Sequence, residues 1–176
     1  MDMTIETDRL FLRPPKEGDA ESMYEHYARH AEVARFLPWP VHENVGVTET
    51  WLKDMEVSNE KETGFHGLLV PKNYGEAIGA FSAREHPFKV DVGYAIGPEF
   101  WGKGYMSEIL RAVIHHYFTY TEKVRVEAIC DVENTGSARV MEKAGMTREA
   151  FLPRYGTARN IDRGPRDMFL YGIIKT

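Results

Sequence analysis

A strand, a glycine-rich turn and a long helix follow one another between residues 89 and 118, and this succession constrains the fold more than any other feature. The stretch KVDVGYAIG reads as a β-strand, and GPEFWGKG then places three glycines within eight residues. Apolar residues next recur at helical spacing, at Met106, Ile109, Leu110, Val113, Ile114, Tyr117 and Phe118. This order predicts a mixed α/β protein in which an amphipathic helix leaves a strand through a tight turn.

The rest of the secondary structure follows from similar patterns. Six further stretches read as strands: DRLFLRP, FHGLLVP, AIGAFSARE, KVRVEAICDV, TREAFLP and RDMFLYGIIK. Three further helices are predicted over residues 18–37, 48–57 and 134–145. Asp19 is a possible N-cap of the first helix and Pro38 its breaker, whereas Asn134 and Gly145 are expected to begin and end the last.

Length and composition limit the classes of protein to consider. The chain has 176 residues, which fits a single domain over residues 1–176. A formal net charge of −5 without a Lys/Arg run argues against a nucleic-acid partner. No apolar run is long enough to span a membrane, and the acidic start MDMTIETDRL is unlike a signal peptide. Because Cys130 is the single cysteine, no internal disulfide can form, and we expect a cytoplasmic protein.

The glycine segment has the features of an anion site, yet it departs from two familiar phosphate motifs. Gly97, Gly102 and Lys103 fit the first seven positions of a P-loop, but Gly104 stands where the Mg²⁺-binding hydroxyl is needed. Gly102 and Gly104 also begin a G-x-G-x-x-G pattern, which Ser107 interrupts. Backbone N–H groups at a glycine turn and a helix start still suit a pyrophosphate. The alternative is a tight turn without a ligand, in which the glycines only permit positive φ.

The context of the glycine segment resembles a known family. The stretches IETDRLFLRP, GYAIGPEFWGKGYMSEIL, NTGSARVMEKAGM and RDMFLYGI together resemble the GNAT superfamily of acyl-CoA-dependent N-acetyltransferases, and most of all its Rim-type branch, which acetylates ribosomal-protein N-termini. The resemblance covers nearly the whole chain. It implies an α/β (α+β) fold with a mixed, mostly antiparallel seven-stranded sheet and about four flanking helices. The sheet would be splayed at its centre, between residues 90–96 and 124–132, and acetyl-CoA would enter there.

The resemblance also implies which residues hold the coenzyme. Backbone groups of Ala95 and Ile96 would pair with the pantetheine arm. The pyrophosphate would bind to the amides of Trp101, Gly102, Lys103, Gly104, Tyr105 and Met106. Asn134 would hydrogen-bond the pantetheine besides capping its helix, and Arg139 either reaches the phosphates or is a solvated helix residue. The first position of the family's Q/R-x-x-G-x-G/A motif is here Glu99, and at worst we expect this anion to reduce affinity.

Direct attack of an amine on acetyl-CoA in a ternary complex needs few protein groups. Ser137 would lie near the thioester sulfur by resemblance and could protonate the leaving thiolate. Asp91, on the strand leading to the coenzyme edge, is the first candidate for the general base, and the alternative interpretation is a solvent-facing strand carboxylate. Glu127 and His86 are lesser candidates, Tyr155 could assist, and a water-mediated base is also compatible with the sequence.

The acceptor side is less defined than the coenzyme side. Phe36 and Trp39 are candidates for shaping a substrate pocket, and the polar stretch RYGTARNIDRGPRD either closes the acceptor site or joins a dimer contact. Cys130 has no paired His and Asp and is expected to be buried, or else to line the thioester end of the tunnel, where it could form a mixed disulfide with coenzyme A. No HExxH motif is present, so no metal is expected.

Three interpretations therefore remain open. The first is an enzyme that acetylates a peptide N-terminus or a small primary amine with acetyl-CoA, as a monomer or homodimer. The second is a coenzyme-A-binding or sensing domain without acceptor chemistry. The third, which the partial P-loop match supports, is a nucleotide-binding ATPase or kinase-like protein that would bind Mg-ATP.

Overall fold

Eight strands form one sheet in the computed structural model, which describes residues 4–61, 64–158, 160–161 and 164–176. The strands are β1 (Ile5–Glu6), β2 (Leu10–Arg13), β3 (Gly64–Pro71), β4 (Gly79–Glu85), β5 (Lys89–Ile96), β6 (Arg125–Asp131), β7 (Thr147–Thr157) and β8 (Pro165–Ile174). Their order in the sheet is β1-β2-β3-β4-β5-β6-β8-β7. The α-helices are α1 (Asp19–Met23), α2 (Ala31–Ala34), α3 (Val45–Glu60), α4 (Tyr105–Tyr120) and α5 (Thr135–Lys143).

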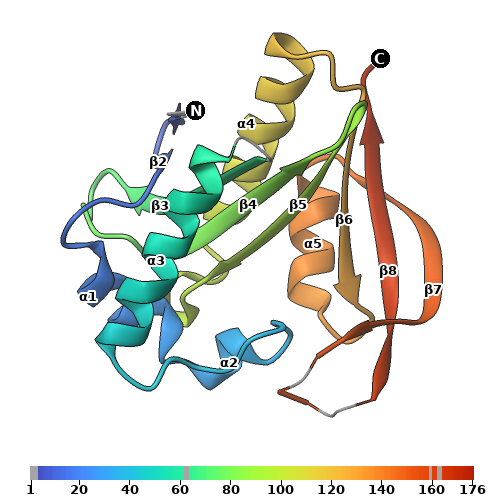
Figure 1. Ribbon diagram of the computed structural model, residues 1–176. Coiled ribbons are helices and arrows are strands. Elements are labelled where there is room, and N and C mark those ends of the chain that lie inside the picture. The colour runs from blue at the N-terminus through green and yellow to red at the C-terminus, as the bar shows by residue number, and fades with distance from the viewer. Residues whose placement is uncertain (1–3, 62–63, 159, 162–163) are drawn as a thin grey trace.

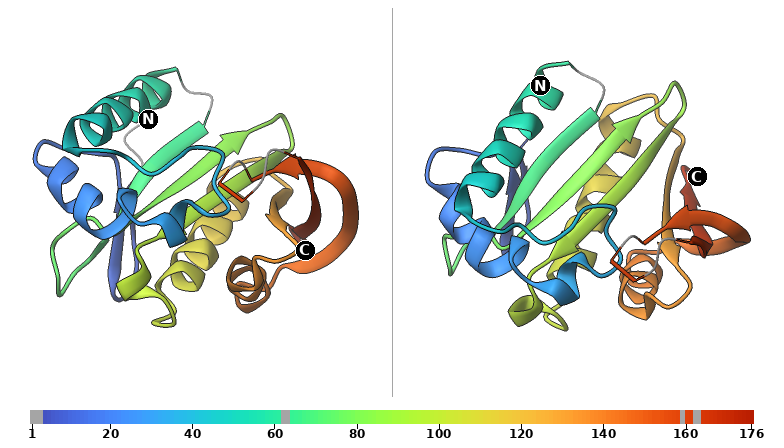
Figure 2. Two further views of the ribbon diagram at one scale, coloured as in Figure 1. Left: turned by 90° about the horizontal axis from the view of Figure 1, so that it is seen from below. Right: turned by 60° about the horizontal axis from the view of Figure 1, so that its bottom comes forward.

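Helices cover both faces of the sheet (Figures 1 and 2). α4 and α5 pack on one face over a core that includes Ile109, Leu110 and Met141, all completely buried. α1 and α3 pack on the other face over a smaller core that includes Met23 and Leu68. The predicted apolar stripe of α4 is confirmed, since burying such a stripe is what holds an amphipathic helix against a sheet.

The sheet separates between β5 and β6. β5 pairs antiparallel with β4 from Val90 to Ile96, but it pairs with β6, in parallel, only over residues 89–91 opposite residues 125–127. β6 pairs with β8 along its full length, so the remainder of β6 turns away from β5 (Figure 1). The predicted mixed, mostly antiparallel sheet with a central splay is confirmed.

The predicted numbers of strands and of helices are both too low, because the N-terminal part of the chain forms more and shorter elements than its pattern indicates. The expected first strand is a hairpin of β1 and β2, which makes eight strands. The helix predicted over residues 18–37 is instead α1, a π-helical turn over Tyr24–Ala28, and α2. It is interrupted at Arg29 and His30, well before Pro38.

Helix caps are partly as predicted. Asn134 accepts a hydrogen bond from the Ser137 N–H (3.1 Å), and Gly145 has a left-handed φ of 92°, so α5 begins and ends as expected. The assignment of Asp19 as an N-cap is wrong, since Gly18 holds that position. The Asp19 carboxylate is buried and forms an ion pair with Arg13 at 2.7 Å.

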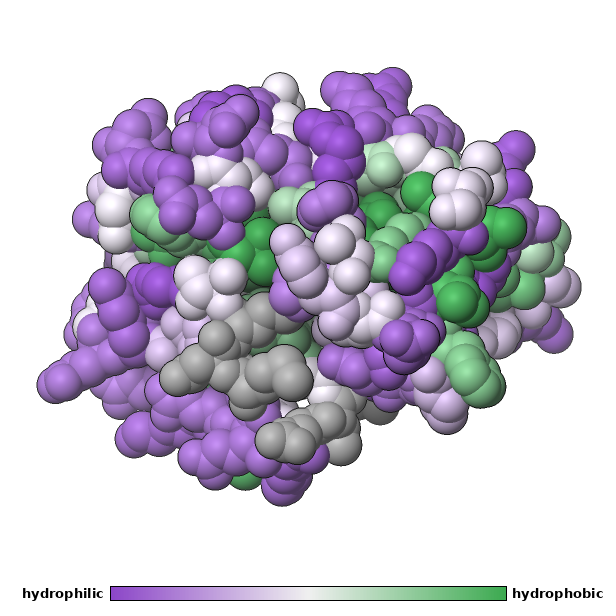
Figure 3. Space-filling model, turned by 90° about the horizontal axis from the view of Figure 1, so that it is seen from above, coloured by the Kyte–Doolittle hydropathy of each residue, from purple (hydrophilic) through white to green (hydrophobic). Residues whose placement is uncertain are grey.

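The upper end of the molecule in Figure 1 carries exposed apolar residues. Seen from above, hydrophobic residues gather over the half that contains β6 and β8, whereas polar residues dominate the other half (Figure 3). Val124 lies at this end, and its backbone N–H donates to the Phe88 carbonyl; the Val124, Phe88 and Ile174 side chains are all exposed. The glycine segment follows the opposite end of β5.

No helix among the described residues is long and apolar enough to cross a membrane.

Candidate active site

The glycine segment forms a turn that presents backbone N–H groups. Gly102 and Gly104 both have left-handed backbones, with φ of 73° and 78°, which residues with a Cβ adopt only with strain. Gly104 is the N-cap of α4, and its carbonyl accepts the first helical hydrogen bond, from Glu108 N–H at 3.1 Å. The amides of residues 105–107 therefore have no acceptor within the helix, and this end of α4 carries its partial positive charge. The turn is chemically suited to an anion.

Gly97 has a different role. A Cβ on this residue would lie 2.0 Å from the His26 carbonyl oxygen, and its φ of −56° is ordinary. A glycine is therefore needed because the π-helical turn packs directly against the backbone at this point. This accounts for the first glycine of the P-loop match without a phosphate.

The side chains around the turn take several directions. The Trp101 indole N–H donates to the Ile96 carbonyl at 2.8 Å and joins the turn to the end of β5. Lys103 extends over the Phe100 ring, with Nζ 4.9 Å from the ring centroid. Met106 is buried in the core, so only its backbone is available to a ligand.

Glu99, the residue that departs from the family motif, is directed toward the π-helical turn. Its exposed carboxylate lies 3.9 Å from Nδ1 of His26. His26 also pairs with Glu76 at 2.9 Å. The anion at position 99 thus has a cationic partner when His26 is protonated.

A reciprocal pair of hydrogen bonds spans the separation between β5 and α5. Ser137 Oγ donates to the Tyr94 hydroxyl, and the Tyr94 hydroxyl donates to the Ser137 carbonyl, each at 3.2 Å. The Tyr94 ring stacks on Phe81 and packs against the core, and desolvation at this place raises the pKa of Tyr94 well above its usual range. Tyr94 therefore remains a neutral hydroxyl that holds Ser137 at the splay.

The sequence did not mark Tyr94 as a site residue. Strand alternation places it on the same face as Val90 and Val92, which lie in the core, so it reads as an apolar aromatic. The sequence could have pointed to Tyr94 only through its hydroxyl, since a tyrosine packed against a core needs a hydrogen-bond partner. The sequence does not show where that partner lies.

The three candidate bases lie together, but apart from Ser137. Asp91 is hydrogen-bonded to His86 (2.7 Å) and forms an ion pair with Lys89 (3.0 Å), and Lys89 also pairs with Glu127. Burial raises the pKa of Asp91, but the hydrogen bonds from Lys89 and His86 outweigh it and lower that pKa overall. Asp91 is also three residues from Tyr94, roughly 10 Å along the strand. A paired carboxylate of lowered pKa is poorly suited to take a proton from an amine.

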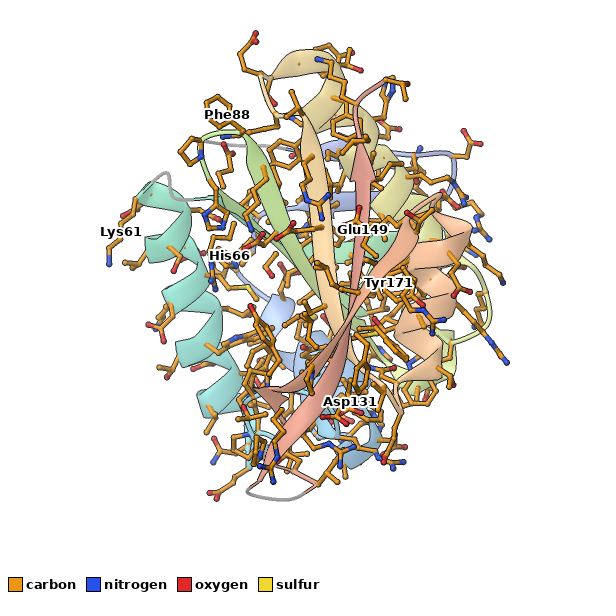
Figure 4. The ribbon with its side chains drawn as sticks, turned by 90° about the vertical axis from the view of Figure 1, so that its right-hand side faces the viewer. Lys61, His66, Phe88, Asp131, Glu149 and Tyr171 are labelled. Carbon is orange, nitrogen blue, oxygen red and sulfur yellow. The ribbon has the colours of Figure 1, made fainter. Side chains whose placement is uncertain are left out.

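This row of charges continues across the sheet. Arg125 pairs with Glu127 on its own strand and with Glu149 on β7. In Figure 4, Glu149 marks the position of this row, whereas Asp131, the last residue of β6, lies well apart from it along the same half of the sheet. The Lys89–Glu127 pair of this row lies where β5 and β6 still pair, so it joins the two halves of the sheet just before they separate.

Comparison with known proteins identifies the family. Residues 9–147 match the acetyltransferase (GNAT) domain. The chain belongs to this family. An uncharacterized N-acetyltransferase of Bacillus subtilis, YoaA, is 26% identical over 175 residues, covering 97% of this chain and 96% of that protein.

Solved structures agree on the fold. A putative ribosomal-protein-serine acetyltransferase from Vibrio cholerae has a TM-score of 0.85 at 23% identity, covering 98% of each chain. RimL, a ribosomal L7/L12 α-N-protein acetyltransferase, has a TM-score of 0.83 at 21% identity, covering 98% of each chain; it was solved with coenzyme A in disulfide linkage to one of its cysteines. At these identities the likeness shows the GNAT fold.

In this GNAT chain Cys130 lies on β6 beyond the point where β5 and β6 separate. Its thiol is buried, and burial, followed by the charges of Asp131 and Glu142, raises the pKa of Cys130 to about 11. The thiol is therefore protonated near neutral pH, which does not suit a nucleophile.

Asn160, within the polar stretch RYGTARNIDRGPRD, contacts the segment that carries the predicted acceptor residues. The Asn160 side-chain amide donates to the carbonyl oxygens of Ala34 (2.7 Å), Leu37 (3.2 Å) and Trp39 (2.8 Å). It thereby fastens the β7–β8 hairpin to the segment that carries Phe36 and Trp39. Residues 159 and 162–163 of the polar hairpin stretch lie outside the described residues.

The remaining candidates stand apart. Tyr155 is 63% exposed, and its side chain makes no hydrogen bond or ring contact with another described residue. Arg139 is exposed on α5. Among the described residues, no three His, Cys, Asp or Glu side chains are grouped so as to hold a metal ion.

Proposed function

We propose that the protein transfers the acetyl group of acetyl-CoA to a primary amine by direct attack in a ternary complex. The observation that carries the proposal is the separation of β5 from β6, which has the Tyr94–Ser137 pair at its side and the glycine turn at its end. The splay of the sheet is thus associated with a strand edge, a hydroxyl donor and a turn suited to an anion.

The residues at the splay between β5 and β6 fit the chemistry of coenzyme A. The diphosphate matches the amides of residues 102–107, which lie at a glycine turn and a helix N-terminus. The peptide-like pantetheine arm matches the β5 backbone at Ala95 and Ile96, because β6 is paired to β5 only up to Asp91. When bound, acetyl-CoA supplies the activated acyl group as a thioester.

The chain's own groups would then assist proton movements. Ser137 is the proton donor to the leaving thiolate, with Tyr94 holding its hydroxyl in place until then. Asp91 is engaged by Lys89 and His86 and has a lowered pKa, so we favour a water molecule, rather than Asp91, as the group that first takes the amine proton.

The proposed acceptor is a primary amine. Structural relatives are described as ribosomal-protein acetyltransferases, which favours a peptide N-terminus of the Rim type, with a small primary amine as the alternative. The acceptor would enter beside Phe36 and Trp39, under the hairpin that Asn160 fastens.

We propose further that Cys130 lines the thioester end of the coenzyme site, a proposal supported by the RimL structure, in which coenzyme A is disulfide-linked to a cysteine of that protein. Incubation with the symmetric disulfide of coenzyme A should transfer one coenzyme to Cys130 and release one free coenzyme A by thiol–disulfide exchange. Because the raised pKa keeps the thiol protonated, this exchange should be slow at neutral pH and faster near pH 9. Mass spectrometry measures the amount of protein that carries one disulfide-linked coenzyme A. Excess acetyl-CoA should slow this exchange, because it occupies the site beside Cys130.

Thiol release tests the proposed activity. The protein is incubated with acetyl-CoA and a panel of N-terminal peptides and small amines, and free coenzyme A is detected. Amine-dependent release that falls by about tenfold or more in Ser137→Ala supports the proposal. Binding of acetyl-CoA without release on any amine would instead favour the coenzyme-sensing alternative.

A further inference from the structure

The β1–β2 turn clamps the outer side of the glycine turn. Arg9 donates from Nη1 to the Lys103 carbonyl oxygen at 3.1 Å and from Nε to Glu108 Oε2 at 2.7 Å. Its guanidinium also lies over the Tyr105 ring, 4.8 Å from the centroid. One side chain from the start of the chain thus contacts the glycine turn and the first helical turn of α4.

Glu108 is itself anchored, so the position of Arg9 is well defined. The Glu108 carboxylate accepts from the Thr7 hydroxyl (2.6 Å) and from the Arg9 backbone N–H (3.1 Å). Burial raises the pKa of Glu108, but the hydrogen bonds from Thr7 and Arg9 outweigh this effect and lower it. Glu108 therefore stays ionised and holds the guanidinium.

The hydrogen bond from Arg9 fixes the direction of one peptide group in the turn. In a planar trans peptide the C=O and the following N–H point in opposite directions. When the Lys103 carbonyl points to Arg9, the Gly104 N–H must point away from Arg9, to the other side of the turn. Because Gly104 has positive φ and is free to rotate, this peptide would otherwise have few restraints.

We infer that Arg9 is a positioning residue for coenzyme binding, which acts by orienting the Lys103–Gly104 peptide so that its N–H faces the diphosphate. This inference rests on the proposed function, because it assumes that the glycine turn holds coenzyme A. It does not require Arg9 to touch the ligand. The geometry of the fork, rather than the charge alone, is what Arg9 supplies.

Binding titrations with two coenzymes test the inference. The variants are Arg9→Gln, which loses the charge, and Arg9→Lys, which keeps the charge but loses the planar fork. The matched control is Arg111→Gln, because Arg111 also donates to a backbone carbonyl, that of Lys143 at 2.9 Å, at a different place on α4. Each protein is titrated by calorimetry with coenzyme A and with dephospho-coenzyme A, which keeps the diphosphate but lacks the 3′-phosphate.

Both Arg9 variants should bind each coenzyme roughly tenfold more weakly, as expected for losing a hydrogen bond from a charged donor, and the factor should be the same for the two coenzymes. Arg111→Gln should bind as the wild type does. In the free proteins, the amide NMR signal of Gly104 should shift in both Arg9 variants, because the Lys103–Gly104 peptide changes direction, and it should keep its wild-type position in Arg111→Gln.

Three results would overturn the inference while leaving the proposed function intact. Wild-type affinity in Arg9→Lys would show that only charge matters. A loss seen with coenzyme A but not with dephospho-coenzyme A would show direct contact with the 3′-phosphate. Unchanged binding in Arg9→Gln would show that the turn orients itself. A wild-type protein that binds neither coenzyme would instead contradict the proposed function.

Discussion

Replacing Tyr94 by phenylalanine removes the hydroxyl that joins β5 to α5 and leaves the ring on Phe81. The hydroxyl takes part in two hydrogen bonds with residue 137, each at 3.2 Å. A hydrogen bond contributes about 0.5–1.5 kcal/mol net, so Tyr94→Phe should lower the free energy of unfolding by about 1–2 kcal/mol. Ser137→Ala removes one of the two bonds and should cost less, because alanine also favours the helix.

The two changes should not add. The Ser137 Oγ–Tyr94 Oη bond is lost in either single variant and can be lost only once. The double variant should therefore be more stable than the sum of the single losses predicts, by about 1 kcal/mol.

Equilibrium urea unfolding of the wild type, the two single variants and the double variant measures this coupling energy. The control cycle pairs Tyr94→Phe with Thr135→Ala, an exposed residue on the same helix, and should be additive. Additivity within about 0.3 kcal/mol for Tyr94 and Ser137 would refute the bridge.

Three further predictions follow from single contacts. Gly104→Ala should destabilise the protein by about 1–2 kcal/mol in urea unfolding, because its φ is positive, whereas Gly136→Ala inside α5 should be neutral or stabilising; equal effects would contradict the assigned conformation. His42 is buried and bonded to Thr48, and burial lowers its pKa, so the unfolded chain binds the proton more readily. Stability from this residue is present above about pH 6.5 and is lost as the pH falls toward the folded pKa, and His42→Asn should flatten that slope in unfolding measured from pH 8 to pH 5. Asn160→Ala should raise the KM for the amine several-fold without changing the dissociation constant of acetyl-CoA, and an equal effect on both would indicate a general loss of structure.

The sequence predicts best those elements whose pattern and surroundings agree. The stripe from Met106 to Phe118 specifies α4, and Asn134 and Gly145 specify the ends of α5, because periodicity and capping are local properties. The central splay came from the resemblance to the family rather than from periodicity, and the strand register agrees with it.

The N-terminal helix shows where local patterns fail. The apolar spacing of residues 18–37 continues through the segment, but the chain widens into a π-helical turn, in which Arg29 N–H donates to the Tyr24 carbonyl at 3.2 Å. Gly97 permits that turn to approach closely, and the sequence alone made this glycine look like part of a phosphate motif.

The site residues that escaped prediction all act over long separations. Arg9 reaches Lys103, and Tyr94 reaches Ser137, through contacts between elements that only the fold brings together. The local motif gives the amides of the glycine turn, whereas the groups that orient them depend on packing. Asp91 is a different case, because Lys89 and His86, which lower its pKa, are close to it in the sequence, yet only the strand geometry shows that they contact its carboxylate.

The most direct test of the account is a calorimetric titration of the purified protein with acetyl-CoA, run in parallel with Mg-ATP. We expect saturable one-to-one binding of acetyl-CoA at micromolar affinity and no binding of Mg-ATP, because Gly104 stands where a P-loop needs its hydroxyl. Binding of Mg-ATP without binding of acetyl-CoA would contradict the assignment of the glycine turn to coenzyme A.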